Sequence, residues 1–206
     1  MRHILVANPK GGSGKTTLST NLAGFFAVQG RNVTLADLDR QQSALQWLER
    51  RPGKYPIIHG LDARRKGVPE KADVLIVDSP AGVHGEKLSE IVKQADCVII
   101  PIQPSAFDIG ATRDFLEVLE EEKAIRKHKT FVAVVGMRVD TRTRSSGVLL
   151  DFLQKTGLPM PTCLRSAQVY ALAAEQGTSL FDMPRSRVVT DLPQWEPLLE
   201  WISKIP

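Results

Sequence analysis

Residues 10–17 combine two lysines, three glycines and two threonines in one short run, a composition suited to binding phosphate. The run reads Lys-Gly-Gly-Ser-Gly-Lys-Thr-Thr, and Lys10 and Lys15 stand five positions apart. Backbone N–H groups of a glycine-rich turn can point inward and bind an anion, because glycine has no side chain to block the approach. Lys15 would place its charge on the β- and γ-phosphates of a nucleotide, and Thr16 would place a hydroxyl at Mg²⁺. The run therefore predicts a phosphate-binding loop.

An apolar run precedes this loop and a helical pattern follows it, which is the context that a phosphate-binding loop requires. Residues 4–7 are Ile-Leu-Val-Ala, and residues 18–29 are amphipathic with a helical period. A helix there adds free N–H groups and the positive end of its dipole. The strict motif G-x-x-x-x-G-K-[ST] is not met, because its first glycine falls on Pro9. The alternative is a glycine-rich turn with incidental lysines, and the agreement of strand, loop and helix argues against it.

Three aspartates follow predicted strands. Asp37 and Asp39 come after residues 33–36, and Asp78 comes directly after residues 74–77. In parallel sheets, ligands bind beyond the carboxyl ends of the strands. A carboxylate there can hold Mg²⁺, directly or through water, or can orient an attacking water. For a single aspartate, capping of the next helix is an equal alternative. Three on one sheet edge argue against pure capping.

Strand-like and helix-like segments alternate along the chain, which predicts a three-layer α/β fold. Its mostly parallel, twisted sheet would carry helices on both faces. We expect one domain over residues 1–206. The expected strands are 4–7, 33–36, 56–59, 74–77, 98–100, 131–135 and 162–164. The expected helices are 18–29, 43–50, 87–94, 109–126, 148–155, 169–175 and 195–202. The polar stretch up to Lys71 matches neither pattern.

Composition limits the class of protein. The chain has 206 residues, a net charge of +4 and two cysteines. This charge is compatible with nucleic-acid binding and does not establish it. Cys97, inside an apolar run, and the distant Cys163 indicate a reducing cytoplasm rather than a disulfide framework. No apolar stretch approaches the ~20 residues of a membrane-spanning helix. Since the first strand begins at Arg2, we expect no targeting segment.

The variant loop K-G-G-x-G-K-T-T resembles the deviant phosphate loop of the ParA/MinD family of P-loop ATPases, which partition DNA and position protein cargo. The resemblance implies ATP and Mg²⁺ as ligands. It implies that Lys10 reaches across a nucleotide-sandwich homodimer to the partner's ATP, while Lys15 acts within its own chain. A second cation at the phosphates would offset the negative charge that develops during phosphoryl transfer.

The resemblance also assigns the aspartates and the nucleotide contacts. Asp39 matches the residue that orients the hydrolytic water, Asp37 its neighbour near the Mg²⁺ shell, and Asp78 the aspartate that contacts Mg²⁺ through water. Thr16 completes the implied metal site. The implied nucleotide contacts are Gly11, Gly12, Ser13, Gly14, Lys15, Thr16, Thr17 and Arg138.

Two departures from the family pattern lie close to this chemistry. Arg40 stands where the family commonly has proline after its second aspartate. Arginine in place of proline relaxes the backbone and adds a cation. Met137 stands where an asparagine of the family frequently contacts adenine, within residues 136–138. Residues 101–105, Pro-Ile-Gln-Pro-Ser, resemble a family segment that is often part of the dimer face and nucleotide pocket.

Basic residues and the family resemblance together favour non-specific DNA binding by the ATP-bound dimer, with nucleoid association in the cytoplasm. Arg138, Arg142 and Arg144 cluster in a polar stretch, and residues 123–129 carry four cations. The candidate DNA contacts are Arg142, Arg144 and Arg165. The alternative for each arginine is an ordinary solvated surface charge. The resemblance also implies a ParB-like adaptor, encoded nearby, that stimulates hydrolysis.

Other functions remain as alternatives to DNA segregation or cargo positioning. A MinD-like, membrane-cycling ATPase would need a basic amphipathic C-terminal helix, whereas residues 194–206 hold one lysine and two glutamates. We therefore expect the tryptophans there to pack on the domain, and no membrane partner. An ATP-dependent ligase of the dethiobiotin-synthetase type is a second alternative. An iron–sulfur reductase needs loop cysteines at a dimer face, and Cys97 lies in a predicted strand.

Overall fold

Seven strands form one parallel sheet in the computed structural model, which describes residues 1–63 and 71–206. The strands are β1 (Arg2–Val6), β2 (Val33–Asp37), β3 (His59–Asp62), β4 (Val74–Asp78), β5 (Cys97–Ile102), β6 (Phe131–Val139) and β7 (Thr162–Arg165). Their order is β3-β2-β4-β1-β5-β6-β7, and every pair runs parallel. Parallel neighbours require crossover connections, and helices supply them.

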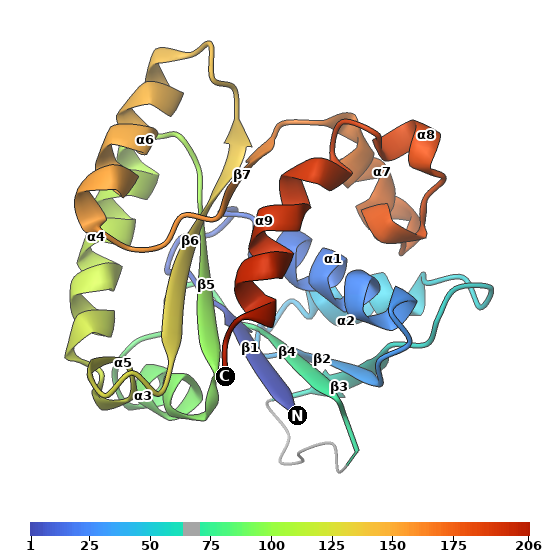
Figure 1. The fold of residues 1–206 in the computed structure, drawn as a ribbon. Helices are drawn as coiled ribbons and strands as arrows, with labels where there is room; N and C mark the ends of the chain where they lie inside the picture. The colour runs from blue at the N-terminus through green and yellow to red at the C-terminus, as the bar shows by residue number, and fades with distance from the viewer. Residues whose placement is uncertain (64–70) are drawn as a thin grey trace.

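Helices cover both faces of the sheet (Figure 1). The helical elements are α1 (Lys15–Val28), α2 (Ser43–Glu49), α3 (Gly85–Gln94), α4 (Ala106–Glu121), α5 (Lys123–Arg126), α6 (Arg144–Thr156), α7 (Gln168–Gln176), η1 (Leu180–Asp182), α8 (Arg185–Val188) and α9 (Leu192–Ser203). α1, α2, α7 and α9 lie on one face, and α3, α4 and α6 lie on the other. The predicted three-layer α/β fold is confirmed.

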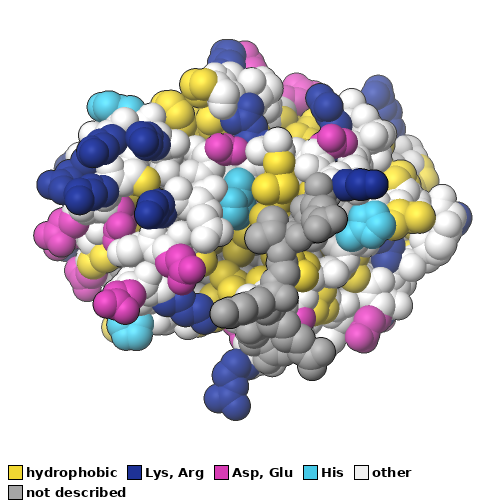
Figure 2. Space-filling model, turned by 90° about the horizontal axis from the view of Figure 1, so that it is seen from below, with side chains coloured by type: hydrophobic (Ala, Val, Ile, Leu, Met, Phe, Trp, Pro, Cys, Tyr) yellow, Lys and Arg dark blue, Asp and Glu magenta, His cyan; other side chains and the backbone are white. Residues whose placement is uncertain are grey.

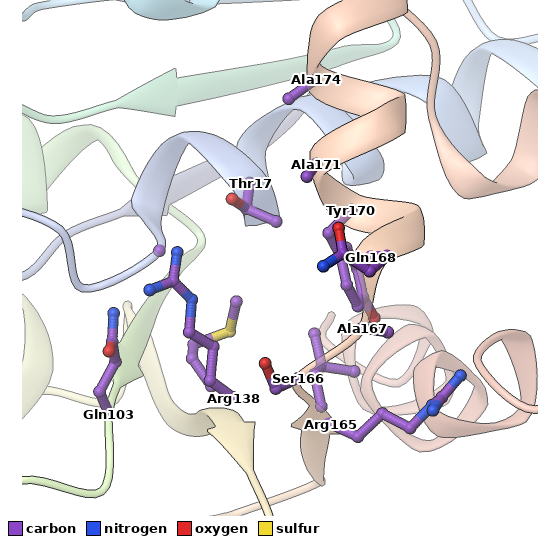
Figure 3. A pocket seen from close by; sticks show the side chains of 13 residues that line it. Thr17, Gln103, Arg138, Arg165, Ser166, Ala167, Gln168, Tyr170, Ala171 and Ala174 are labelled. Carbon is purple, nitrogen blue, oxygen red and sulfur yellow. The ribbon is translucent and has the colours of Figure 1, made fainter.

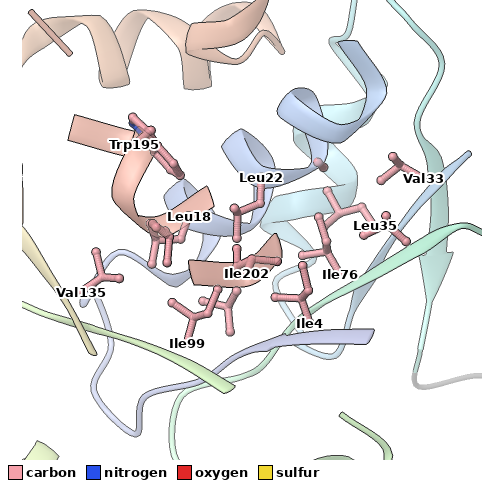
Figure 4. Packing of buried hydrophobic residues seen from close by; sticks show 14 of the residues in the cluster. Ile4, Leu18, Leu22, Val33, Leu35, Ile76, Ile99, Val135, Trp195 and Ile202 are labelled. Atoms are coloured by element: carbon pink, nitrogen blue, oxygen red, sulfur yellow. The ribbon is translucent and has the colours of Figure 1, made fainter. Parts of the chain in front are cut away.

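The core consists of two apolar layers, one on each side of the sheet. Along β1, Ile4 belongs to one layer and Leu5 to the other, because successive strand residues point to opposite faces. Figure 4 shows Leu18 and Leu22 of α1 above the central strands, with Ile202 of α9 beside them. The central strands are buried on both faces, so their sequences are continuously apolar rather than alternating.

The strand that we expected at 56–59 is shifted along the chain: β3 begins at His59 and ends at Asp62. Pro56 has no N–H to donate, and the Ile57 side chain is 75% exposed. β3 is an edge strand whose register aligns Thr34 with His59. The ambiguous polar stretch before Lys71 lies mostly outside the described residues.

The expected long helix 109–126 is two helices. α4 ends at Glu121, and Glu122 has an extended backbone with φ −66° and ψ 127° before α5 begins. No proline or glycine marks this break in the sequence. The tryptophans of the C-terminal helix pack on the domain as expected: Trp195 is fully buried and Trp201 packs against the same core layer. Among the described residues, no helix combines the length and apolar character that a membrane span needs.

Candidate functional site

The phosphate-binding loop connects the end of β1 at Val6 to the start of α1 at Lys15. Gly12 and Gly14 have φ values of 77° and 104°, a region that glycine enters without strain. A Cβ on Gly14 would lie 2.8 Å from Cε at the flexible end of Met137, so the positive φ is the stronger restriction at this position. A Cβ on Gly11 or Gly12 would have no neighbour within 4 Å. The loop is therefore shaped by its backbone and is open on its outer side.

The two lysines of the loop have different surroundings. Lys15 Nζ donates a hydrogen bond to the Lys10 carbonyl at 2.8 Å. Burial lowers the Lys15 pKa, and the charges of Asp78 and Asp39 partly offset this effect. Lys10 is half-buried, and its side chain forms no ion pair with another described residue. Its backbone N–H is fixed by Asn8 Oδ1 at 2.8 Å. One lysine is thus folded into the loop, and the other is available at the loop entrance.

Thr16 and Asp78 form the center of the candidate metal site. The Thr16 hydroxyl donates to Asp78 Oδ2 at 2.7 Å, and the Ser19 hydroxyl donates to Asp78 Oδ1 at 3.1 Å. Burial is the main cause that raises the Asp78 pKa to about 7, against the hydrogen bonds from both hydroxyls. No group of three or more acidic, histidine or cysteine side chains in the described chain could hold a metal unaided. This fits Mg²⁺, which is bound by one or two protein ligands together with phosphates and water.

Asp37 caps helix α2, so the capping alternative considered for the three aspartates is observed at this one. Its Oδ2 accepts the backbone N–H of Ala44 at 2.9 Å and of Leu45 at 3.4 Å. Its Oδ1 accepts the N–H of Asp39 at 2.8 Å. Both carboxylate oxygens are therefore engaged by the backbone, and burial raises the Asp37 pKa. Through the bond to Asp39, Asp37 also fixes the loop that carries the second aspartate and Arg40.

Strand register brings the aspartates to the phosphate loop. Val6 aligns with Asp78 across β1 and β4, and Asp37 aligns with Asp78 across β2 and β4. Asp39 lies two residues past the end of β2, and it is half-exposed. The predicted gathering of Asp37, Asp39 and Asp78 at one sheet edge beside the loop is therefore observed.

A cavity of about 440 Å³ adjoins the loop, between α1 and α7 (Figure 3). The residues that line it are Gly14, Thr17, Gln103, Met137, Arg138, Leu164, Arg165, Ser166, Ala167, Gln168, Tyr170, Ala171 and Ala174. Figure 3 shows Arg138 between Gln103 and Thr17, with the side chains of Ala171 and Tyr170 across the cavity. Arg138 has φ 54° at an irregularity of the β6–β7 register, and such a bulge redirects a side chain.

Thr17 and Arg138, which the family resemblance implies as nucleotide contacts, line this cavity, and the sequence analysis did not predict the cavity residues that follow β7. Ser166, Ala167 and Tyr170 carry no phosphate-binding signature. Only their position in the sequence could have indicated them. They follow the carboxyl end of β7, and the phosphate loop follows the carboxyl end of β1, at the same end of the parallel sheet.

The candidate DNA-contacting arginines are not equivalent. Arg142 pairs with Asp140 at 2.8 Å, and this pairing lowers the Asp140 pKa to about 2. Arg165 pairs with Asp191 at 2.8 Å. Arg144 is exposed and has no ion pair with another described residue. The expected polar cluster is also divided, since Arg138 lies in β6 and Arg144 begins α6.

The four cations of residues 123–129 lie at the other end of the molecule. Figure 2 views that end from below, and Lys and Arg side chains gather on one side of it. α5 joins the start of β6, whereas the phosphate loop follows the end of β1. The basic residues of the chain therefore form at least two separate surfaces.

Comparison with known proteins gives the family. Residues 4–178 match the CobQ/CobB/MinD/ParA nucleotide binding domain. A maintenance of carboxysome distribution protein A from Halothiobacillus neapolitanus is 27% identical over 198 residues, covering 91% of each chain. Its namesake from Gloeobacter kilaueensis is 30% identical over 190 residues, covering 87% of this chain and 83% of that protein. The putative plasmid partition protein of Borrelia burgdorferi bound to AMPPNP shares the fold, with a TM-score of 0.74, 17% identity and 99% of each chain covered. The chain therefore belongs to the CobQ/CobB/MinD/ParA family of nucleotide-binding domains.

Proposed function

We propose that the protein is an Mg-ATP-dependent ATPase that dimerises on ATP and positions a protein cargo or segregates DNA on the nucleoid. The observation that carries this proposal is the pair of lysines in the loop. Lys15 Nζ is bound within the loop, whereas Lys10 has no acidic partner in its own described chain. A cation at the entrance of an open phosphate loop is suited to a phosphate that a second subunit holds.

The residues of the loop fit a nucleoside triphosphate and its metal ion. Ser13 Oγ is buried without a hydrogen-bond partner, as expected of a hydroxyl in a loop that closes around an anion. Thr16 and Asp78 supply hard oxygen ligands for Mg²⁺, and the bound ion would neutralise charge on the phosphate oxygens. Asp39, whose backbone N–H is held by Asp37 Oδ1, would orient the attacking water. The cavity beside Arg138 has room for the base and ribose.

The two relatives that maintain carboxysome distribution favour cargo positioning over the other activities of the family. Both are named for the distribution of carboxysomes, and each alignment covers more than four-fifths of both chains. In this proposal ATP acts as the switch, because only the triphosphate binds the dimeric state preferentially. A ParB-like adaptor protein stimulates hydrolysis and resets the cycle.

DNA binding in this proposal is sequence-independent and sensitive to salt. Of the candidates Arg142, Arg144 and Arg165, two already hold a carboxylate, so each would exchange that partner for a phosphate. The test is retention of the protein on random-sequence duplex DNA as salt is raised, with ATP and with ADP. Equal retention in both states would remove the nucleotide switch.

A membrane-cycling function is disfavoured by α9. Its Trp195, Leu198 and Ile202 are buried in the core layer and are not free to enter lipid. Co-sedimentation with anionic vesicles in the presence of ATP would reveal this alternative. ATP turnover that depends on a small carboxylic acid and ignores DNA would reveal a ligase.

The dimer is tested by changing each lysine separately. Lys15→Ala should abolish tight ATP binding. Lys10→Ala should retain ATP binding and lose both dimerisation, measured by light scattering, and hydrolysis. Lys93→Ala, an exposed lysine in the last turn of α3, serves as the matched control. A Lys10→Ala protein that dimerises and hydrolyses ATP like the wild type would overturn the proposal.

A further inference from the structure

Asn8 is a polar side chain that is fully buried beside the phosphate loop. It lies two residues after β1 ends at Val6, and it does not line the nucleotide cavity. Burying an amide costs free energy unless hydrogen bonds replace those that water would make. The role of Asn8 therefore follows from the groups that it binds.

Both ends of the Asn8 amide are bound. Its Oδ1 accepts the backbone N–H of Lys10 at 2.8 Å. Its Nδ2 donates to the Pro101 carbonyl at 2.8 Å and to Thr112 Oγ1 at 3.1 Å. An N–H is bound by the amide oxygen and a carbonyl by the amide nitrogen, so these partners fix the orientation of the amide. Asn8 thus connects the phosphate loop to the central strand β5 and to helix α4.

The backbone of Lys10 is held at both of its polar groups, whereas its side chain is not held. Asn8 binds the N–H, and Lys15 Nζ donates to the carbonyl at 2.8 Å. Pro9 has a φ angle that is fixed by its ring, and its carbonyl accepts the Gly82 N–H at 2.9 Å. The Lys10 side chain forms no ion pair with another described residue. A mobile side chain therefore begins at a fixed backbone position.

We propose that Asn8 is a positioning residue that holds Lys10 in place for contact with the nucleotide of a second subunit. This inference rests on the proposed function, in which Lys10 makes that contact. Ordering a long lysine side chain costs conformational entropy, and a displaced backbone would add to the cost of forming the dimer. Asn8 reduces this cost by fixing the Lys10 backbone before the subunits meet. It acts through Lys10, because its own side chain is fully buried.

Thr112 anchors Asn8 to helix α4. It lies in the second turn of the helix, is fully buried, and accepts the Asn8 N–H through its hydroxyl oxygen. Gln103 makes a second link between this segment and the loop, because its side chain donates to the Gly12 carbonyl. The position of Lys10 is therefore tied to α4 as well as to the loop that contains it. Thr112→Val removes the hydroxyl at nearly unchanged side-chain volume and leaves the bond between Asn8 and Lys10 intact.

The first test measures the dissociation constant of the dimer by analytical ultracentrifugation, with Mg²⁺ and a slowly hydrolysed ATP analogue. Asn8→Ala removes all three bonds and should weaken the dimer about tenfold. Thr112→Val removes one bond and should weaken the dimer less, whereas Thr112→Ser keeps the hydroxyl and should match wild type. The ATP affinity of the monomer should stay within about threefold of wild type, because Asn8 binds the Lys10 N–H and the glycine-rich turn begins one residue later.

Thr130→Val is the matched control, because it removes another buried threonine hydroxyl at the opposite end of the sheet. Thr130 directly precedes β6, and its hydroxyl donates to the Val92 carbonyl at 3.2 Å and to the Ala95 carbonyl at 2.8 Å. The variant should lose stability in urea as Thr112→Val does, with the dimer unchanged. Adding Thr112→Val to Asn8→Ala should weaken the dimer no further, because the bond between the two residues is already absent.

Hydrogen exchange at the Lys10 amide tests the positioning directly, without nucleotide or dimer. The buried Asn8 oxygen protects this N–H from exchange. In NMR measurements, Asn8→Ala should speed exchange at Lys10 by about tenfold or more, and Thr130→Val should leave it unchanged. A general loss of stability would act alike in both variants.

Three results would overturn the positioning role. One is equal exchange at Lys10 in wild type and Asn8→Ala. Another is a wild-type dimer in Asn8→Ala when Lys10→Ala no longer dimerises. The last is an equal weakening of the dimer by Thr112→Val and Thr130→Val. A wild type that never dimerises on ATP would contradict the proposed function, and faster exchange in Asn8→Ala would then still support the placement of Lys10 by Asn8.

Discussion

The Thr16 hydroxyl and the Asp78 carboxylate are joined by a 2.7 Å hydrogen bond between the first turn of α1 and the end of β4. The bond places two candidate oxygen ligands for Mg²⁺ side by side. Ser19 holds the other Asp78 oxygen, so the carboxylate has one fixed orientation. Preorganised ligands of this kind reduce the cost of assembling a metal site.

The stability of the protein without nucleotide should fall as pH rises toward neutrality, because burial raises the Asp78 pKa to about 7 from the ordinary aspartate value of 3.8. Between these two values the folded state binds more protons at this site than the unfolded state. The free energy of unfolding therefore decreases with rising pH across this window, by at most roughly 4 kcal/mol in total.

Urea denaturation at pH 5 and pH 8 measures this effect. Asp78→Asn should flatten the pH dependence and be more stable than wild type at pH 8. Asp140→Asn is the control, because pairing with Arg142 lowers the Asp140 pKa to about 2 and places its titration below this window. A wild type and an Asp78→Asn protein with equal slopes would refute a raised pKa at Asp78.

Filling the cavity beside the loop should weaken nucleotide binding without unfolding the protein. Ala171 is exposed and lines the cavity from α7, so Ala171→Trp places a large ring inside it. We expect a loss of about tenfold or more in ATP affinity, measured by calorimetry, with little change in melting temperature. Val189→Trp, at an exposed apolar position after α8, is the control. Unchanged affinity in Ala171→Trp would exclude this cavity as the base and ribose site.

The ion pair between Arg51 and Asp182 should contribute strongly to stability, because only 6% and 0% of the two side chains is exposed. Asp182 also accepts hydrogen bonds from the Ser179 N–H and hydroxyl. Arg51→Ala would leave this carboxylate buried without its cation and cost about 3–5 kcal/mol. Lys204→Ala breaks an exposed pair with Glu200 and should cost less than about 1 kcal/mol. Similar urea midpoints for both variants would contradict this ranking.

Much of the site could be predicted from sequence because its parts are local. The loop is one contiguous run, and the aspartates follow strands whose parallel order places their ends together. The ion pair of Arg165 could not be predicted, because its partner Asp191 lies 26 residues away. The small residues of the cavity, such as Ala167 and Ala171, have no chemical signature. The break at Glu122 has no proline or glycine to mark it, and the contact that Glu122 makes there is distant in sequence: Ser89 of α3 donates to its carboxylate at 2.6 Å.

Asp37 is the residue at which two predictions compete. The family resemblance places it near the Mg²⁺ shell, whereas its carboxylate oxygens accept backbone N–H groups of Asp39, Ala44 and Leu45. A cap acts on helix stability and on the position of the following loop. A metal ligand acts on the Mg²⁺ concentration that activity requires. The two roles therefore predict different measurements.

We expect Asp37→Ala to behave as the loss of a cap. The variant should lose about 1–2 kcal/mol of stability, because buried N–H groups at the start of α2 lose their acceptor. Its hydrolysis rate should fall, since Asp39 loses the bond that fixes it, while the Mg²⁺ concentration for half-maximal activity stays within about twofold of wild type. Asp37→Asn, which retains an acceptor oxygen, should recover part of the stability. Asp78→Ala is the comparison, and it should raise the Mg²⁺ requirement by about tenfold or more. A comparable rise in Asp37→Ala would assign Asp37 to the metal shell.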